Sequence, residues 1–253
     1  MLEQTFHTPL PLDLEVDIPS GAIEIETVEG EELRVTVDGD ERLLAEVDVR
    51  EDGNRVTVSY RGKAKFGFSL TPFTVVWDTK LRVRATIPHG AGVKVKTVSA
   101  DTRIDGRLGS LNVNAVSGDT RVVGEIAGAA TLKSVSGDAE LSAVHGNLTI
   151  HSVSGDLRVG PVGGSVETKT LSGDIRFDAI REGDVHFTSV SGDVEIGIAP
   201  GSLVDVDAGS TSGDLSSEVP LASEPVAGEE TGGPTVVVRG RTISGDVRVF
   251  RAA

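Results

Sequence analysis

Apolar and polar residues alternate along short stretches of the chain, and the same stretch returns about every 18 residues. The tripeptide Ser-Gly-Asp marks the repeat. It begins at Ser117, Ser136, Ser154, Ser172, Ser191, Ser212 and Ser244, and Ser99-Ala100-Asp101 is a variant of it. Successive serines from Ser99 are separated by 18, 19, 18, 18, 19, 21 and 32 residues. Such a fixed period predicts a repeat architecture in which each copy is one structural unit.

Each copy predicts two strands with a side-chain period of two. Apolar residues stand three and five positions after the serine, as Leu157 and Val159 do, and six and four positions before it, as Leu148 and Ile150 do. These columns should face the core. The apolar residue directly before each serine is also expected inside, in the corner where the chain bends: Val98, Val116, Val135, Val153, Leu171, Val190 and Ile243.

The predicted fold class is all-β. One lap of this length cannot bury its apolar side alone, so laps should stack at ~4.8 Å and pair in parallel with the copies above and below. The pattern therefore predicts a single-stranded parallel β-solenoid, or β-helix, of 18-19-residue rungs, with right-handed winding favoured. Asp52 and Gly53, between two alternating runs, predict an N-terminal antiparallel hairpin insertion.

We expect a single domain. After a lead-in at 1–12, the solenoid should fill residues 13–253. Its parts are a first rung at 13–40, the hairpin insertion at 41–88, repeat rungs at 89–215, an acidic loop at 216–235 and a last rung at 236–253. In the first rung, Ser20-Gly21-Ala22 looks like a copy of the tripeptide that has lost its aspartate.

The copies of Ser-Gly-Asp with their apolar flanks resemble a bacterial β-strand-repeat family labelled putative adhesins, also called toastrack domains. The resemblance covers roughly residues 13 to 250 and rests on the period as well as on the tripeptide. It implies a β-solenoid that often occurs beside membrane-bound envelope-stress components and has no established enzymatic activity.

Charge and composition narrow the function classes. The chain has 253 residues, 24 Lys+Arg against 39 Asp+Glu and a net charge of −15, which argues against a nucleic-acid partner. It has no cysteine, which excludes disulfides, thiolate metal sites and cysteine nucleophiles. No run approaches the ~18 apolar residues of a membrane span, and the N-terminus lacks a signal-peptide pattern. We therefore expect a cytoplasmic protein with no transmembrane segment.

The aspartates of the repeat should form a ladder along the stack: Asp101, Asp119, Asp138, Asp156, Asp174, Asp193, Asp214 and Asp246. Like charges ~4.8 Å apart repel one another. Either the carboxylates accept backbone N–H bonds beside an arginine column, or calcium ions lie between laps. Calcium rolls need two dense glycine-aspartate turns per lap, and this repeat has one, so we favour a structural turn ladder. We expect no metal and no cofactor, since the five histidines share no metal-ligand spacing.

A mostly basic column stands three positions before each serine and should face outward: Lys96, Asn114, Lys133, His151, Lys169, Thr188 and Arg241. Such a column either binds an anionic polymer or is a solvated face that blocks sheet-on-sheet association, and we favour the solvated face.

A cluster of aromatic residues precedes the repeats. Tyr60, Phe66, Phe68, Phe73 and Trp77 fall within 18 residues, and eight basic residues lie between Arg61 and Lys96. The cluster is either a cap over the open end of the solenoid or a docking surface for a protein partner or a membrane. We favour the cap.

We predict a non-enzymatic scaffold or interaction module, linked to envelope-stress signalling or to adhesion. One alternative is a calcium- or polysaccharide-binding adhesin. Another is a β-helix polysaccharide lyase or hydrolase, whose long loops and paired carboxylates this repeat lacks, so no catalytic residue is assigned. The sequence does not identify a protein partner. Because basic residues gather before the repeats and acidic residues near their end, copies of the chain could also associate end to end.

Overall fold

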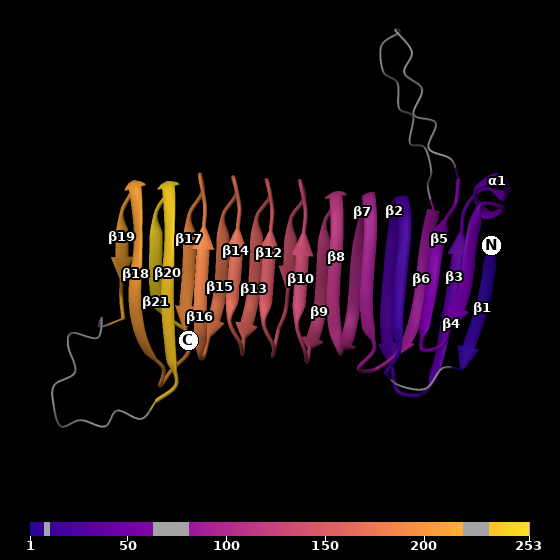
Figure 1. Cartoon of the computed structure of the whole chain (residues 1–253), viewed down its shortest axis with the longest axis horizontal. Coiled ribbons are helices and arrows are strands. Elements are labelled where there is room, and N and C mark those ends of the chain that lie inside the picture. The colour runs from indigo at the N-terminus through magenta and orange to yellow at the C-terminus, as the bar shows by residue number, and fades with distance from the viewer. Residues whose placement is uncertain (8–10, 63–80, 220–232, 253) are drawn as a thin grey trace, which may run out of the picture.

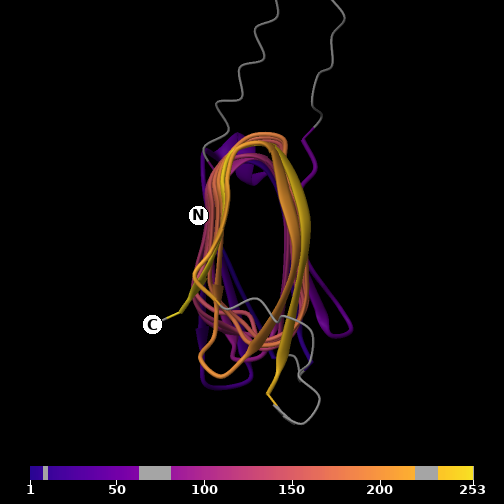
Figure 2. The same ribbon diagram turned by 90° about the vertical axis from the view of Figure 1, so that its left-hand side faces the viewer.

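The computed structural model describes residues 1–7, 11–62, 81–219 and 233–252. In these residues a continuous sheet of 21 strands winds into a flattened solenoid, with one short helix, α1 (Glu41–Leu44), near the N-terminal end (Figure 1). Viewed along the stack, the rungs overlie one another and form a narrow oval with two long walls (Figure 2). The predicted fold class, an all-β parallel solenoid with an antiparallel hairpin near its N-terminus, is confirmed.

The first wall consists of the strands that lead into the Ser-Gly-Asp corner. It begins with the first halves of β2 (Asp13–Val28) and β7 (Gly92–Leu108). It continues with β8 (Ser110–Ser117), β10 (Ala130–Lys133), β12 (Leu148–His151), β14 (Val166–Lys169), β16 (Gly183–Thr188), β20 (Thr235–Ser244) and β18 (Leu203–Ser212). Each strand pairs in parallel with the strand of the next rung, for example Leu148 with Val166.

The second wall consists of the strands that follow the corner. After the second halves of β2 and β7 come β9 (Thr120–Ile126), β11 (Ala139–Leu141), β13 (Leu157–Val162), β15 (Ile175–Ile180), β17 (Val194–Ile198), β21 (Val247–Arg251) and β19 (Leu215–Ser217). These pair in parallel in the same way, for example Leu157 with Ile175.

The core lies between the walls and contains the columns that the sequence predicts. Leu157 and Val159 in the second wall, and Leu148 and Ile150 in the first, are each at most 2 % exposed. The apolar residues of these columns in the other rungs are buried with them in one continuous cluster, except in the end rung, where Val206 and Ala208 are partly buried and Leu215 is 46 % exposed. Burial of this cluster supplies the main favourable free energy of folding.

The glycine of the tripeptide has a backbone conformation and a close contact that other residues do not tolerate. Gly155 has a φ of +120°, and a Cβ at that position would lie 2.2 Å from the carbonyl oxygen of Gly137 in the preceding rung. At a corner with this conformation, glycine therefore lets successive rungs stack at the spacing of paired strands. In the variant rung Ala100 takes the same place without a positive φ, and β7 runs through it as one strand.

At the N-terminal end, the first rung in the sequence is not the outermost rung in space. β2 pairs with β7, where Ser20 stands opposite Ser99, and on its other side with β5 (Arg55–Tyr60) and β6 (Leu81–Pro88). Beyond them, β4 (Val47–Asp52) pairs antiparallel with β5, while β3 (Glu32–Asp38) and then β1 (Leu2–His7) extend antiparallel from β6. The hairpin predicted at Asp52 and Gly53 is the β4–β5 connection.

At the C-terminal end, too, the order of the rungs in space differs from their order in the sequence. β20 lies between β16 and β18, and β21 lies between β17 and β19. The rung that is last in the sequence is thus next to last in space, and the rung of β18 and β19 forms the end (Figure 1). β19 includes residues 216 and 217, which the sequence interpretation assigns to the acidic loop, and residues 220–232 of that loop lie outside the described residues.

One expectation about the corner is wrong. The apolar residues before the serines face solvent instead of the core: Val98, Val116, Val135, Val153, Leu171, Val190 and Ile243. In five rungs the inside of the corner holds a small hydroxyl residue one position earlier, which donates a side-chain hydrogen bond of 3.1 to 3.4 Å to the carbonyl oxygen of the repeat serine: Ser134, Ser152, Thr170, Ser189 and Thr242. This bridge fills the inside of the corner, and the next side chain points outward.

Candidate functional site

Seven exposed aliphatic side chains form a line along one edge of the solenoid, one in each of seven neighbouring rungs. We call this line the edge ridge, and it consists of Val98, Val116, Val135, Val153, Leu171, Val190 and Ile243, each 36 to 55 % exposed. It follows the edge at which β8 ends, the upper edge in Figure 1. Six steps of ~4.8 Å give it a length of about 29 Å. Single exposed aliphatic residues are ordinary, whereas a continuous apolar line is typical of an interaction surface.

Backbone hydrogen bonds fix the position of the ridge. The N–H of Ser154 donates to the carbonyl oxygen of Val135 one rung before, at 2.9 Å, and the N–H of Ser172 donates to that of Val153 at the same distance. The pairing of the first wall therefore continues to the corner, and the alternation of inward and outward side chains continues with it. The alternation of a strand, continued through the corner, predicts the ridge correctly. Ile150 points inward, Ser152 two residues later also points inward, and Val153 therefore points outward.

The fold does not need an aliphatic residue in this column. In the end rung, Ser212 stands opposite Ser244, so Thr211 occupies the place that Ile243 has in the neighbouring rung. Thr211 is exposed in an otherwise regular strand. The rung thus forms with a polar residue at the ridge position, and seven aliphatic residues there have no explanation in the packing of the core.

The basic column runs along one side of the ridge, on the first wall. A shallow groove between the two is lined by Lys96 and Lys133 from the column and by Val98, Val116 and Val135 from the ridge. The column faces outward, as the sequence predicts.

Most cations of the basic column have an acidic partner on the same wall. The Nζ of Lys96 lies 2.8 Å from Glu15, and Lys169 lies 2.6 Å from Glu167. These ammonium groups, which donate hydrogen bonds to the carboxylates, lower the pKa of Glu15 and that of Glu167. Within the described part of the chain, Lys133 has no carboxylate within 4.0 Å.

The aspartate ladder runs along the other side of the ridge, at the start of the second wall. Every aspartate of the ladder except Asp214, in the end rung, accepts through Oδ1 the backbone N–H of the aspartate in the next rung. Asp119 accepts that of Asp138 at 2.9 Å, and Asp138 accepts that of Asp156 at 2.8 Å. Seven such bonds of 2.8 to 3.1 Å connect all eight: Asp101, Asp119, Asp138, Asp156, Asp174, Asp193, Asp246 and Asp214, in spatial order. The N–H donors offset the repulsion between neighbouring carboxylates.

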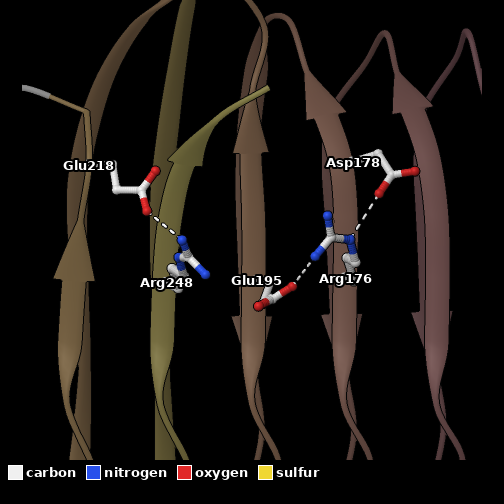
Figure 3. A network of polar contacts seen from close by, with 5 residues as sticks. All are labelled: Arg176, Asp178, Glu195, Glu218 and Arg248. Atoms are coloured by element: carbon white, nitrogen blue, oxygen red, sulfur yellow. Dashed lines mark hydrogen bonds and ion pairs between the residues drawn. The ribbon is translucent and has the colours of Figure 1, made fainter. Parts of the chain in front are cut away.

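An arginine column follows two residues after the aspartates. Figure 3 shows two of its members: Arg176 contacts Asp178 in its own strand and Glu195 in the next rung, and Arg248 contacts Glu218. The Asp178 carboxylate, which accepts a hydrogen bond from the guanidinium, raises the pKa of Arg176, and Glu218 does the same for Arg248. This part of the surface is a set of exposed ion pairs, each of which contributes little to stability.

The aromatic cluster falls mostly on residues that the structure does not describe. Tyr60 is half-buried against the core and borders the groove beside the ridge. Phe66, Phe68, Phe73 and Trp77 lie outside the described residues, so the choice between a cap and a docking surface stays a prediction. Over the described ranges, no group of three or more His, Asp or Glu side chains is placed to hold a metal ion. The helix in the same ranges is neither long enough nor apolar enough to cross a membrane.

Comparison with known proteins agrees with the geometry. Residues 12–250 match the family model described as Toastrack DUF4097. The chain is 14% identical to a solved structure described as a putative adhesin from Bacteroides fragilis NCTC 9343, with a TM-score of 0.54 over 98% of this chain and 96% of that one. It is also 14% identical to one described as a putative lipid binding protein from Parabacteroides distasonis ATCC 8503, with a TM-score of 0.52 and the same coverage. No curated protein is similar enough in sequence to count as a relative.

Proposed function

This chain belongs to the toastrack family, and we propose that it is a non-enzymatic interaction module whose edge ridge is the recognition surface. The observation that carries the proposal is the ridge itself: seven aliphatic residues exposed in register, in a column where the fold accepts Thr211. Exposed apolar area costs solubility, so a continuous line of it is typical of a surface that a partner covers.

A polysaccharide-binding adhesin is a weaker alternative. The similar fold from Bacteroides fragilis is described as a putative adhesin, but binding of sugar rings usually uses exposed aromatic faces. Phe177 and Phe187 are buried in the core, as the sequence predicts, and Phe250 is half-buried beside the guanidinium groups of Arg176 and Arg248. Along the described rungs, the exposed apolar surface is aliphatic.

Hydrolysis or elimination on the second wall is also disfavoured. A groove of ≈ 680 Å³ there contains Asp156, Asp174 and Glu195. Both aspartates accept a backbone N–H, and Glu195 is paired with Arg176. Glycosidases need a pair of carboxyl groups that are free to act on the bond between two sugars, whereas these carboxylates are already engaged by the backbone and by an arginine of their own wall. The links to envelope stress or adhesion, and the cytoplasmic location, stay predictions from the sequence.

Site-specific photo-crosslinking in the cells that make the protein tests the proposal. A photoreactive amino acid replaces Val135 on the ridge or, as the matched control, Val123, an exposed valine of the second wall away from the ridge. We expect crosslinked products from position 135 and none from position 123. A chain that gives no product from position 135, or equal products from both, would show that the ridge is not a recognition surface.

A further inference from the structure

In four of its seven rungs the edge ridge has a lysine or arginine on one side and an aspartate on the other. In the rung of Val135, Lys133 lies two residues before the ridge and Asp138 three residues after it. The same order of cation, aliphatic residue and aspartate occurs at Val98, Leu171 and Ile243, with Lys96, Lys169 and Arg241 as the cations. Across these four rungs the order is therefore cation, aliphatic residue, aspartate. Three of the cations are paired with a carboxylate of their own wall, and Lys133 has none within 4.0 Å in the described part of the chain.

We propose that the edge ridge binds the edge ridge of a second copy of this chain, with the two solenoids side by side and parallel. The inference rests on the proposed function and names the partner of the same surface. A two-fold axis along the stack reverses the order of the three columns in the second copy. Val135 then meets Val135, while Lys133 faces the second copy's Asp138.

Charge selects this arrangement over the other face-to-face one. If the two stacks ran antiparallel, the basic column of one copy would face the basic column of the other, and the two aspartate ladders would also face each other. Like charges in contact cost free energy, whereas opposite charges set the register of an interface. Lys133, which has no acidic partner in the described part of the chain, is the cation best placed to pair with the second copy.

Within the described residues, the corners that carry the ridge form one continuous edge. The described rungs overlie one another in the view along the stack, so the backbone corners that carry the ridge lie nearly in line (Figure 2). From basic column to aspartate ladder the surface spans five residues, or roughly 16 Å of chain, beside about 29 Å of length. This area is below the ~800 Å² per partner of a standard interface. The dimer should therefore be weak and should dissociate at micromolar concentration.

An anionic membrane fits the ridge less well. The structurally similar protein from Parabacteroides distasonis is described as a putative lipid binding protein, and the basic column would favour anionic lipid headgroups. However, eight aspartates flank the ridge on its other side, and the net charge of the chain is −15. These carboxylates oppose the approach of an anionic surface and match the basic column of a second copy.

Engineered cysteines test both the partner and its direction, since the chain contains no cysteine of its own. We compare Val98→Cys, Val153→Cys and Ile243→Cys, at the two ends and the middle of the ridge, with Val123→Cys as the exposed control. In the parallel dimer each ridge residue faces its own copy, so all three variants should form disulfide-linked dimers on mild oxidation and the control should not. A dimer from Val153→Cys alone would show an antiparallel pair and overturn the proposed arrangement.

Charge reversal tests the pairing without altering the ridge. Lys133→Glu should weaken the dimer about tenfold in sedimentation equilibrium. Arg158→Glu, which reverses the charge of another exposed residue, one on the second wall, should not. A wild-type chain that stays monomeric at about 100 µM would overturn the proposal. So would ridge-dependent binding to phosphatidylglycerol vesicles by such a monomer. Crosslinks from position 135 to a different molecule would then leave the proposed function intact and exclude the second copy as the partner.

Discussion

The Oγ of Ser152 donates a hydrogen bond to the carbonyl oxygen of Ser154 across 3.3 Å, on the inner side of the corner. This contact stabilises the bend, because the carbonyl group of Ser154 no longer takes part in the strand pairing of the wall and finds its hydrogen-bond donor in Ser152. The backbone therefore determines that Val153 lies on the surface, but it does not require that the residue there be a valine.

We expect Ser152→Ala to lower the free energy of unfolding by about 1 kcal/mol, since a half-buried carbonyl loses its donor. Val153→Thr should change it by less than about 0.5 kcal/mol, because the side chain is exposed and Thr211 occupies the same column. Urea unfolding of both variants measures the difference. A larger loss from Val153→Thr than from Ser152→Ala would mean that the edge ridge is part of the core.

The columns of the second wall can be tested in one rung. Leu157 is 1 % exposed, and Leu157→Asp places a charge in the core without a partner, which should cost more than about 4 kcal/mol and unfold the middle of the stack. Asp156→Asn keeps an Oδ1 acceptor for the N–H of Asp174 and should cost less than about 1 kcal/mol. Thermal melts followed by circular dichroism rank the two. The reverse ranking would require a register shifted by one residue.

The aspartate ladder should be independent of calcium. Each Oδ1 from Asp101 to Asp246 already accepts a backbone N–H, so the ladder forms without a cation between rungs. A ligand that binds only the native state raises the melting temperature. We expect midpoints within about 1 °C of each other in millimolar calcium and in a chelator. A rise of several degrees with calcium and none with magnesium would assign the ladder to calcium binding.

Glu15 should make stability depend on pH at the acidic end. Its side chain is 13 % exposed, and hydrogen bonds from Lys96 and Lys94 lower its pKa below the ordinary glutamate value of 4.5. A carboxyl group whose pKa is lowered by folding stabilises the native state above its unfolded pKa, and this contribution disappears as the pH falls through its folded pKa.

The variant Glu15→Gln should therefore be less stable than the wild type by about 1 kcal/mol near pH 7, and the difference should shrink as the pH falls below 4.5. Melts of both proteins between neutral and acidic pH measure it. Glu24→Gln is the control, because Glu24 lies 3.9 Å from Arg82 with both side chains about half exposed. A constant difference across the range would show that Glu15 acts through packing and not through its charge.

Much of the architecture follows from the repeat, because stacking of identical rungs forces columns of like residues together. The spacing around Ser154 predicted that Leu148, Ile150, Leu157 and Val159 are buried, and they are. The prediction for Val153 is wrong because two signals disagree there: its apolar side chain favours the core, whereas the alternation of the strand places it outside. In this corner the alternation determines the outcome, because the side chain of Ser152 occupies the inside of the corner and Val153 is left on the outside.

The order of the end rungs could not be predicted from the pattern. β20 offers β16 the same backbone donors and acceptors as β18 does, so strand periodicity is satisfied by either order. What distinguishes the two is the fit of particular side chains between neighbouring rungs: Gly240, for example, lies against the ring of Phe187, and a Cβ there would be 2.4 Å from that ring. Such a contact has no signature in the spacing of Ser-Gly-Asp.

The interleaved C-terminal rung has a consequence for how the chain is made. A ribosome releases residues 203–217 before residues 235–251, yet the earlier segment finds its parallel partners only on the later one. A nascent solenoid can add rungs as they emerge up to β16 and β17, and β18 and β19 then lack their native partners until β20 and β21 have been made. A chain whose synthesis stops in this interval presents open strand edges to proteases and chaperones. The edges of β18 and β19 that face β20 and β21 are covered only after the ribosome has translated the chain to residue 251.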